Sequence, residues 1–196
     1  MNMDCYKICC HAILKRKRVT YMIETERLIL RPVYETDLAD IYDYAKDEAV
    51  GPHAGWKPHE NIEESEEIAC AFFYEKEDAF AIVEKNSMCM IGTIGLVEDP
   101  HRANDEVRML GYAMGRLYWG EGFMVEAAKA VLEYGFVHKK YPLISVSHYD
   151  FNTRSKRVIE KCGFHFEGIL RRGAKRYDGE VFDMWCYSLT KDEYEN

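Results

Sequence analysis

The sequence lacks the features that mark several common classes of protein. It has no apolar run long enough to span a bilayer, and residues 1–21 lack the apolar stretch of a secretory signal peptide. Its seven cysteines include no Cys-x-x-Cys pair, so a zinc ribbon or a thioredoxin-like redox site is not supported. We therefore expect a cytoplasmic protein with reduced thiols and no metal site.

Internal repeats and low-complexity tracts are also absent, and the composition is that of one folded domain. The 196 residues are 47% hydrophobic and 31% charged, with a formal net charge of -8. Because an acidic chain disfavours non-specific binding to nucleic acid, we expect neither nucleic acid nor a membrane as a partner. Composition does not fix the oligomeric state, so a monomer and a homodimer both stay open.

Residues 1–21 differ from the rest of the chain. They hold five Lys or Arg against one Asp, a net charge of +4, which leaves -12 on the remaining residues. They are either an N-terminal extension or residues upstream of a natural start at Met22, and a partner-binding basic arm is the functional alternative. In either case residues 22–196 are expected to form the single domain.

Periodicity and turn residues predict a mixed α/β fold. The strongest helical period runs from Met124 to Phe136, with apolar residues at i, i+3, i+4, i+7 and i+8. Further helices are predicted at 36–45, from about 59 to 76, and at 152–162. Strands are predicted at 27–31, 79–84, 90–98, 106–114 and 143–148, followed by two strands joined by a turn at 177–180. The order of these elements indicates one layered α/β domain.

A glycine-rich turn joins the strand at 106–114 to the strongest helix. Its exposed N–H groups and the positive end of the helix form a candidate diphosphate site. A P-loop is excluded because Glu121 and Gly122 stand where Lys and Ser or Thr are needed. A dinucleotide-binding fingerprint is not supported, because Val125 replaces its third glycine. An ordinary strand-to-helix turn is the plain alternative.

Six short sequence motifs, in the same order along the chain, resemble those of the GNAT acetyltransferases related to ribosomal-protein alanine N-acetyltransferases. They lie at 24–32, 91–95, 110–112, 119–127, 152–155 and 160–168. The resemblance implies a mostly antiparallel sheet, splayed between its fourth and fifth strands and flanked by about four helices. It also implies acetyl-CoA as co-substrate and direct acetyl transfer to a primary amine, either a protein N-terminus or a small molecule.

The resemblance assigns a role to each matching residue. N–H groups for the CoA pyrophosphate would come from Trp119, Gly120, Glu121, Gly122, Phe123 and Met124. The backbone of Ala113 and Met114 would pair with the pantetheine arm, and the N–H near Met114 would hold the oxyanion. Asn152 would bind a pantetheine amide, and Ser155 would protonate the departing thiolate. Without the resemblance, Asn152 reads as a helix N-cap and Ser155 as a polar residue of the first turn.

Two positions depart from the family pattern. Met109 stands where relatives often have Glu, and Leu117 where many have Arg or Gln. The second change is tolerable because that loop works through its backbone, but the first removes a ready general base. The amine would then lose its proton to Glu98 or Asp99 at a strand end, or through water; we favour water, with Glu98 as the named side chain.

The loop at 51–58 is the expected site of substrate choice. An aromatic face can cover an alkylammonium group, so His53 and Trp56 are the candidate substrate-binding residues, although Trp56 could equally be a hydrophobic plug. Four scattered histidines are interpreted as surface or packed residues: His101, His138, His148 and His165. A non-catalytic acetyl-CoA sensor, favoured by Met109, is the alternative function.

Overall fold

The computed structural model describes residues 21–196, which contain one eight-stranded sheet in the order β1-β2-β3-β4-β5-β6-β8-β7. Its strands are β1 (Ile23–Glu24), β2 (Leu28–Pro32), β3 (Ala79–Glu84), β4 (Met90–Glu98), β5 (Arg108–Met114), β6 (Leu143–Tyr149), β7 (His165–Lys175) and β8 (Val181–Thr190). All neighbours pair antiparallel except β5 and β6. The prediction of a mostly antiparallel mixed sheet is confirmed; the two-residue β1 was not predicted.

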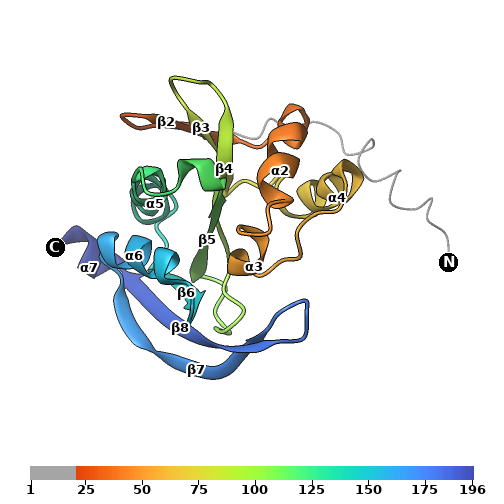
Figure 1. Cartoon of the computed structure of the whole chain (residues 1–196). Helices are drawn as coiled ribbons and strands as arrows, with labels where there is room; N and C mark the ends of the chain where they lie inside the picture. Colours follow the sequence, from red (N-terminus) through yellow and green to blue (C-terminus); the bar gives the residue numbers. More distant parts are fainter. Residues whose placement is uncertain (1–20) are drawn as a thin grey trace.

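Helices cover both faces of the sheet. The described residues contain α2 (Leu38–Ala45), α3 (Gly51–Ala54), α4 (Ile62–Phe72), α5 (Phe123–Glu133), α6 (Thr153–Lys161) and α7 (Lys191–Glu195). Figure 1 shows α5 and α6 on one side of the sheet and α2, α3 and α4 on the other. Two hydrophobic clusters correspond to these two faces. No helix within residues 21–196 is long and apolar enough to cross a membrane.

The predicted apolar stripe of α5 is its buried face. Ala127, Ala128 and Val131 are fully buried, and Leu132 is 1% exposed. Small residues at the first two positions allow the helix to lie close to the sheet, and burial of each large aliphatic side chain contributes about 1.5–3 kcal/mol. This packing fixes the N-terminus of α5 beside the end of β5.

The sheet opens between β5 and β6, the predicted fourth and fifth strands. Only Arg108 with Ile144 and Met109 with Ser145 are paired between them, so the rest of β5 has no partner on that side. Asp99 braces the paired end, since it accepts hydrogen bonds from Ser145 Oγ at 2.5 Å and Arg102 Nε at 3.0 Å. The predicted splay is therefore present, with its closed end held by polar contacts.

The N-terminal boundary predicted at residues 21 and 22 falls beside a packed residue. Residues 1–20 lie outside the described part of the chain. Tyr21, which the sequence assigned to the extension, packs its ring 4.8 Å from that of Tyr134 and 4.9 Å from that of His138. The packed domain therefore includes Tyr21.

Candidate active site

A cleft of about 690 Å³ occupies the opening between β5 and β6. Its walls come from these two strands, the turn before α5, the beginnings of α5 and α6, and α3. Its volume lies in the range usual for sites that bind small molecules and cofactors. The sheet opening and the glycine-rich turn thus belong to one site.

The turn between β5 and α5 presents its backbone to this cleft. Gly120 and Gly122 have φ values of 91° and 82°, in the left-handed region that favours glycine. Gly122 is the N-cap of α5, and no side chain caps the first N–H groups of this helix. Trp119, Phe123 and Met124 line the cleft together with these glycines. The arrangement is suited to an anion.

Glu121 lies on the outer side of the turn, and its side chain does not line the cleft. Its backbone carbonyl accepts a hydrogen bond from Arg27 Nη1 at 2.9 Å. Arg27 Nε in turn contacts Glu126 Oε2 at 2.7 Å, and Thr25 Oγ1 donates to Glu126 Oε1 at 2.6 Å. The turn between β1 and β2 therefore braces the glycine turn from behind.

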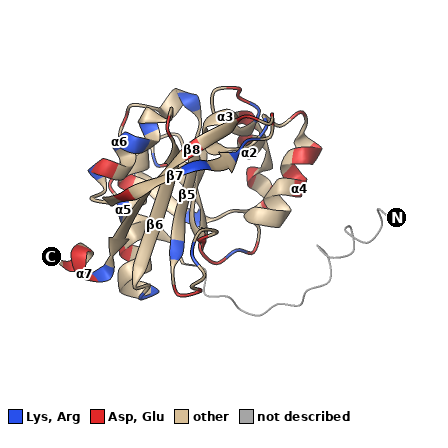
Figure 2. Ribbon diagram, turned by 90° about the horizontal axis from the view of Figure 1, so that it is seen from below, with Lys and Arg blue, Asp and Glu red and all other residues tan. Residues whose placement is uncertain are grey.

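A row of cations along α6 lines the same cleft. Arg154, Arg157 and Lys161 all line it, and the Arg154 guanidinium lies 4.1 Å from the Trp119 ring centroid. Figure 2 shows the basic colouring of α6 and the acidic colouring of α4 on the other side of the sheet. Sequence reasoning missed this row, although its i, i+3, i+7 spacing on one helix was a readable signal.

No Asp or Glu side chain lines the cleft within residues 21–196. With the α6 cations and the positive end of α5, this makes the cleft electropositive in a chain whose net charge is -8. The cleft therefore complements a phosphate-bearing ligand better than a cationic one.

The register of β5 decides which backbone groups face the opening. Gly115 donates its N–H to Ile91 of β4, and Ala113 lies opposite Thr93. Because ladder groups alternate along an antiparallel strand, the peptide groups of Ala113 point to β4, and those of Met114 and Tyr112 point to the opening. The expectation that the Ala113 backbone pairs with pantetheine is corrected accordingly.

Met114 keeps an N–H on the open side. Its carbonyl oxygen already accepts a hydrogen bond from Trp119 Nε1 at 2.8 Å. Its assignment as oxyanion donor stays a prediction, and the alternation gives Tyr112 an equivalent N–H nearer the closed end of the opening.

Ser155 lies in the first turn of α6 and forms a hydroxyl pair. Its Oγ is 2.7 Å from the hydroxyl oxygen of Tyr112, and both residues line the cleft. Burial raises the pKa of Tyr112 well above its usual value, although the hydrogen bond to Ser155 acts in the opposite direction. The tyrosine thus stays protonated, and either hydroxyl can donate the hydrogen bond between them. Sequence reasoning did not find this pairing, because 43 residues separate the two side chains.

Asn152 joins two elements that carry candidate site residues. Its Oδ1 accepts the N–H of Ser155 at 3.1 Å, so it is the N-cap of α6. Its Nδ2 donates to the backbone carbonyl of His53 in α3 at 2.9 Å. Both ends of the amide are engaged inside the protein, and binding of pantetheine by Asn152 stays a prediction.

His53 lines the cleft, whereas Trp56 does not. The His53 ring meets Phe151 edge-on at 5.4 Å, and its buried Nδ1 has no hydrogen-bond partner within the described residues. Burial lowers the pKa of His53, and the charge of Arg154 lowers it further. Trp56 packs with the second hydrophobic cluster and against Gly51, where an added Cβ would lie 2.8 Å from the Trp56 carbonyl. The substrate-binding role expected for Trp56 is therefore corrected to packing behind α3.

Glu98 is exposed at the far end of β4 and does not line the cleft. It pairs with Arg108, six residues before Met114, which is about 20 Å along the strand. Asp99, the neighbouring candidate, is buried and occupied by Ser145 and Arg102. The structure therefore places Glu98 away from an acceptor bound near Met114, and its role as base stays a prediction that this position does not favour.

His148 is a packed residue, as its sequence interpretation had it. It is 4% exposed, its Nδ1 lies 2.7 Å from the Tyr149 carbonyl, and its ring stacks with those of Trp185 and Tyr187. Within residues 21–196, no group of three or more His, Cys, Asp or Glu side chains is arranged to hold a metal ion.

Comparison with protein families gives a match over most of the chain. Residues 27–165 match the acetyltransferase (GNAT) domain. An uncharacterized N-acetyltransferase of Bacillus licheniformis is 29% identical over 175 residues, 87% of this chain and 96% of the relative. The ribosomal protein uS5-alanine N-acetyltransferase of Escherichia coli is 26% identical over 189 residues, 88% of this chain and 92% of the relative.

Solved structures share the fold. A GNAT-family acetyltransferase from Bacillus anthracis superposes with a TM-score of 0.78 at 24% identity, covering 88% of this chain and all of that one. The spermidine N-acetyltransferase of Vibrio cholerae, solved in complex with CoA and spermine, superposes with a TM-score of 0.74 at 20% identity. It covers 88% of this chain and all of its own. Both support the sheet topology described above.

Proposed function

The chain belongs to the GNAT acetyltransferase family, and from this premise we propose that its cleft binds acetyl-CoA and directs the acetyl group to a single primary amine. Family membership makes the chain an N-acetyltransferase, and acetyl-CoA is the donor that GNAT acetyltransferases use. The residues that do this work and the nature of the acceptor are the proposal.

One observation carries the proposal: three anion-binding features converge on the open edge of β5. They are the glycine turn at Gly120 and Gly122, the uncapped N-terminus of α5 and the cation row on α6. A CoA molecule needs such a site for its phosphates and an unpaired strand edge for its pantetheine amides. The described residues fit it on both counts.

The chemistry follows from the groups around the opening. The amine nitrogen attacks the thioester carbonyl, the C–N bond forms, and an N–H of the open β5 edge, at Met114 or Tyr112, stabilises the oxyanion. The nitrogen gives up one N–H proton, which leaves to solvent, and the C–S bond then breaks. The thiolate takes the proton of Ser155 Oγ, and Tyr112 supplies a proton to Ser155 before solvent restores the pair. The products are the amide and CoA as free thiol.

The charge of the cleft bears on the acceptor. A polyamine such as the spermine bound to the Vibrio cholerae relative carries several positive charges, which acidic side chains would have to neutralise. The lining within the described residues holds no carboxylate and several cations. We therefore favour an acceptor with one amine and no further positive charge near it, such as the α-amine of a protein N-terminus.

The experiment is an acceptor screen with CoA release as readout. The panel contains N-terminal peptides, amino acids, amino sugars and polyamines, each at matched amine concentration. Turnover of α-amines above that of spermidine supports the acceptor class, and the reverse order refutes it. The alternative function, a non-catalytic acetyl-CoA sensor, is favoured by the missing carboxylate at Met109. The sensor function is supported if acetyl-CoA binds but no amine releases CoA above the hydrolysis background.

A further inference from the structure

The acceptor amine must lose a proton, either to water or to a side chain, and no carboxylate lines the cleft within the described residues. Met109 occupies the strand position closest to the paired end of the opening and carries no titratable group. Among the lining side chains, two histidines are the groups that accept a proton near neutral pH: His53 and His148.

His148 is unsuited to this task because both of its ring nitrogens face protein atoms. Nδ1 lies 2.7 Å from the Tyr149 carbonyl, so it carries a proton, and Nε2 faces the Tyr187 hydroxyl at 3.5 Å. The ring is buried between Trp185 and Tyr187. A proton acceptor needs a nitrogen that substrate can reach.

His53 sits differently. It comes from α3, on the face of the sheet opposite α5 and α6, the helices that provide the anion-binding groups (Figure 1). Its backbone carbonyl is tied to Asn152, the N-cap that also holds Ser155, so α3 and the start of α6 keep a fixed relation. Its Nδ1 is buried and closed to the cleft, so Nε2 is the ring nitrogen that would have to meet the acceptor.

We propose that His53 is the general base that accepts the proton of the acceptor amine, a role that rests on the proposed function. As the nitrogen attacks and the C–N bond forms, an N–H proton passes to the imidazole. The imidazolium later returns this proton to solvent, while the thiolate is protonated from the side of Ser155. Base and acid thus approach the thioester from opposite faces of the sheet.

The surroundings of His53 keep its ring neutral. Burial lowers its pKa, the charges of Arg154 from α6 and Arg176 from the β7–β8 hairpin lower it further, and the Ala49 carbonyl offsets this in part. A weak base of this kind matches an α-amine, whose pKa of about 8 lies within roughly two units of a histidine. An alkylamine with a pKa near about 10.4 is a poorer match.

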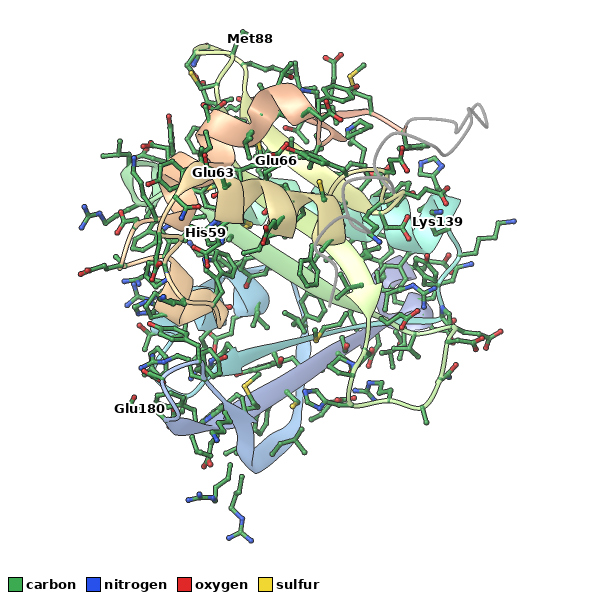
Figure 3. The ribbon with its side chains drawn as sticks, turned by 90° about the vertical axis from the view of Figure 1, so that its right-hand side faces the viewer. His59, Glu63, Glu66, Met88, Lys139 and Glu180 are labelled. Atoms are coloured by element: carbon green, nitrogen blue, oxygen red, sulfur yellow. The ribbon has the colours of Figure 1, made fainter. Side chains whose placement is uncertain are left out.

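The test compares His53→Gln with His59→Gln, at a histidine that lies beside α4 away from the cleft (Figure 3). His59 is also buried, and its Nδ1 is bonded to Ser65 Oγ at 2.7 Å, so it controls for loss of a buried imidazole. We expect His53→Gln to lower kcat about 100- to 10,000-fold with acetyl-CoA affinity unchanged. His59→Gln should keep the wild-type rate in folded protein.

The pH profile separates a base from a structural residue. Because the pKa of His53 is lowered, wild-type kcat should fall as the pH drops below about 6.5, where the imidazole becomes charged. His53→Gln should lack this limb, and added imidazole should partly restore the rate of His53→Ala.

Three results would overturn the assignment of His53. The first is a dependence of kcat on pH in His53→Gln that matches the wild type. The others are a failure of imidazole to restore the rate of His53→Ala, and loss of the acidic fall in kcat in His148→Gln instead. Each presupposes an active wild-type enzyme. A wild type that releases no CoA with any amine would refute the proposed function itself, so the two failures are distinguishable.

Discussion

A negative charge placed at Gly122 should weaken acetyl-CoA binding through electrostatics, and the structure allows this effect to be separated from backbone strain. Gly122 has φ of 82°, and an added Cβ would lie 3.6 Å from Arg27 Nη2, so a side chain fits in space. Any residue other than glycine nevertheless costs about 1–2 kcal/mol there, because the backbone is left-handed. Gly122→Gln and Gly122→Glu pay this cost equally.

The difference between these two variants is one charge. A carboxylate about 5 Å from a phosphate repels it by about 1–3 kcal/mol, between the limits for water and for a protein surface, and an ion pair with the neighbouring Arg27 would move the effect toward the lower limit. Acetyl-CoA should therefore bind Gly122→Glu about 5- to 150-fold more weakly than Gly122→Gln. The gap should narrow at high salt, because ions screen a partly exposed pair.

The assay is calorimetric titration with acetyl-CoA at low and at high salt, with thermal unfolding recorded for each variant. Gly163→Gln serves as the control for strain, since Gly163 has φ of 84°, open space around its Cβ position and no place in the cleft. Both Gln variants should lose about 2–8 °C in Tm. Equal acetyl-CoA affinity of Gly122→Glu and Gly122→Gln would refute the assignment of this turn to the pyrophosphate.

Three further outcomes follow from the site and are checked by steady-state kinetics or thermal unfolding. Ser155→Ala should keep acetyl-CoA affinity and lose about tenfold to thousandfold in kcat, because the thiolate departs without its acid; an unchanged kcat would show that no protein acid is used. Glu98→Gln should leave kcat unchanged over the whole pH range, since Glu98 lies outside the cleft lining, and a lost pH limb would restore it as the base. A chain that starts at Tyr21 should keep the full Tm and acetyl-CoA affinity, whereas a start at Met22 should lower Tm by removing the ring packed on Tyr134; equal Tm values would show that this contact contributes nothing.

Helices and strands that bury one face in the core could be predicted from the sequence. The helix α5 was found because its stripe at Ala127, Ala128 and Val131 alternates with polar residues at a helical period. The strands were found from short apolar runs between turn residues. The two-residue β1 carries too few positions for any period, so it could not be found in this way.

The candidate site was predictable where one segment forms it and not where distant segments meet. The glycine turn is a local feature with a local cause, positive φ at Gly120 and Gly122. The direction of the Ala113 backbone depends on its register with β4, and the place of Glu98 depends on where β5 and β6 part. Neither can be read from neighbours in sequence. Trp56 stands in a turn-rich loop, and the lack of a side chain at Gly51 makes room for it to pack, half-buried, against the second hydrophobic cluster.

The motif at residues 24–32 contributes no side chain to the cleft, but it holds the glycine turn in position. Its Arg27 donates its backbone N–H and its Nε to Glu126 in the first turn of α5 and its Nη1 to the carbonyl of Glu121. Burial disfavours the charge of Glu126, but the hydrogen bonds from Thr25 and Arg27 outweigh it and lower the pKa of this carboxyl. The edge of the sheet thus holds the glycine turn from behind, and the turn keeps its N–H groups directed into the cleft. A segment about a hundred residues away from the turn is therefore part of the same anion-binding unit.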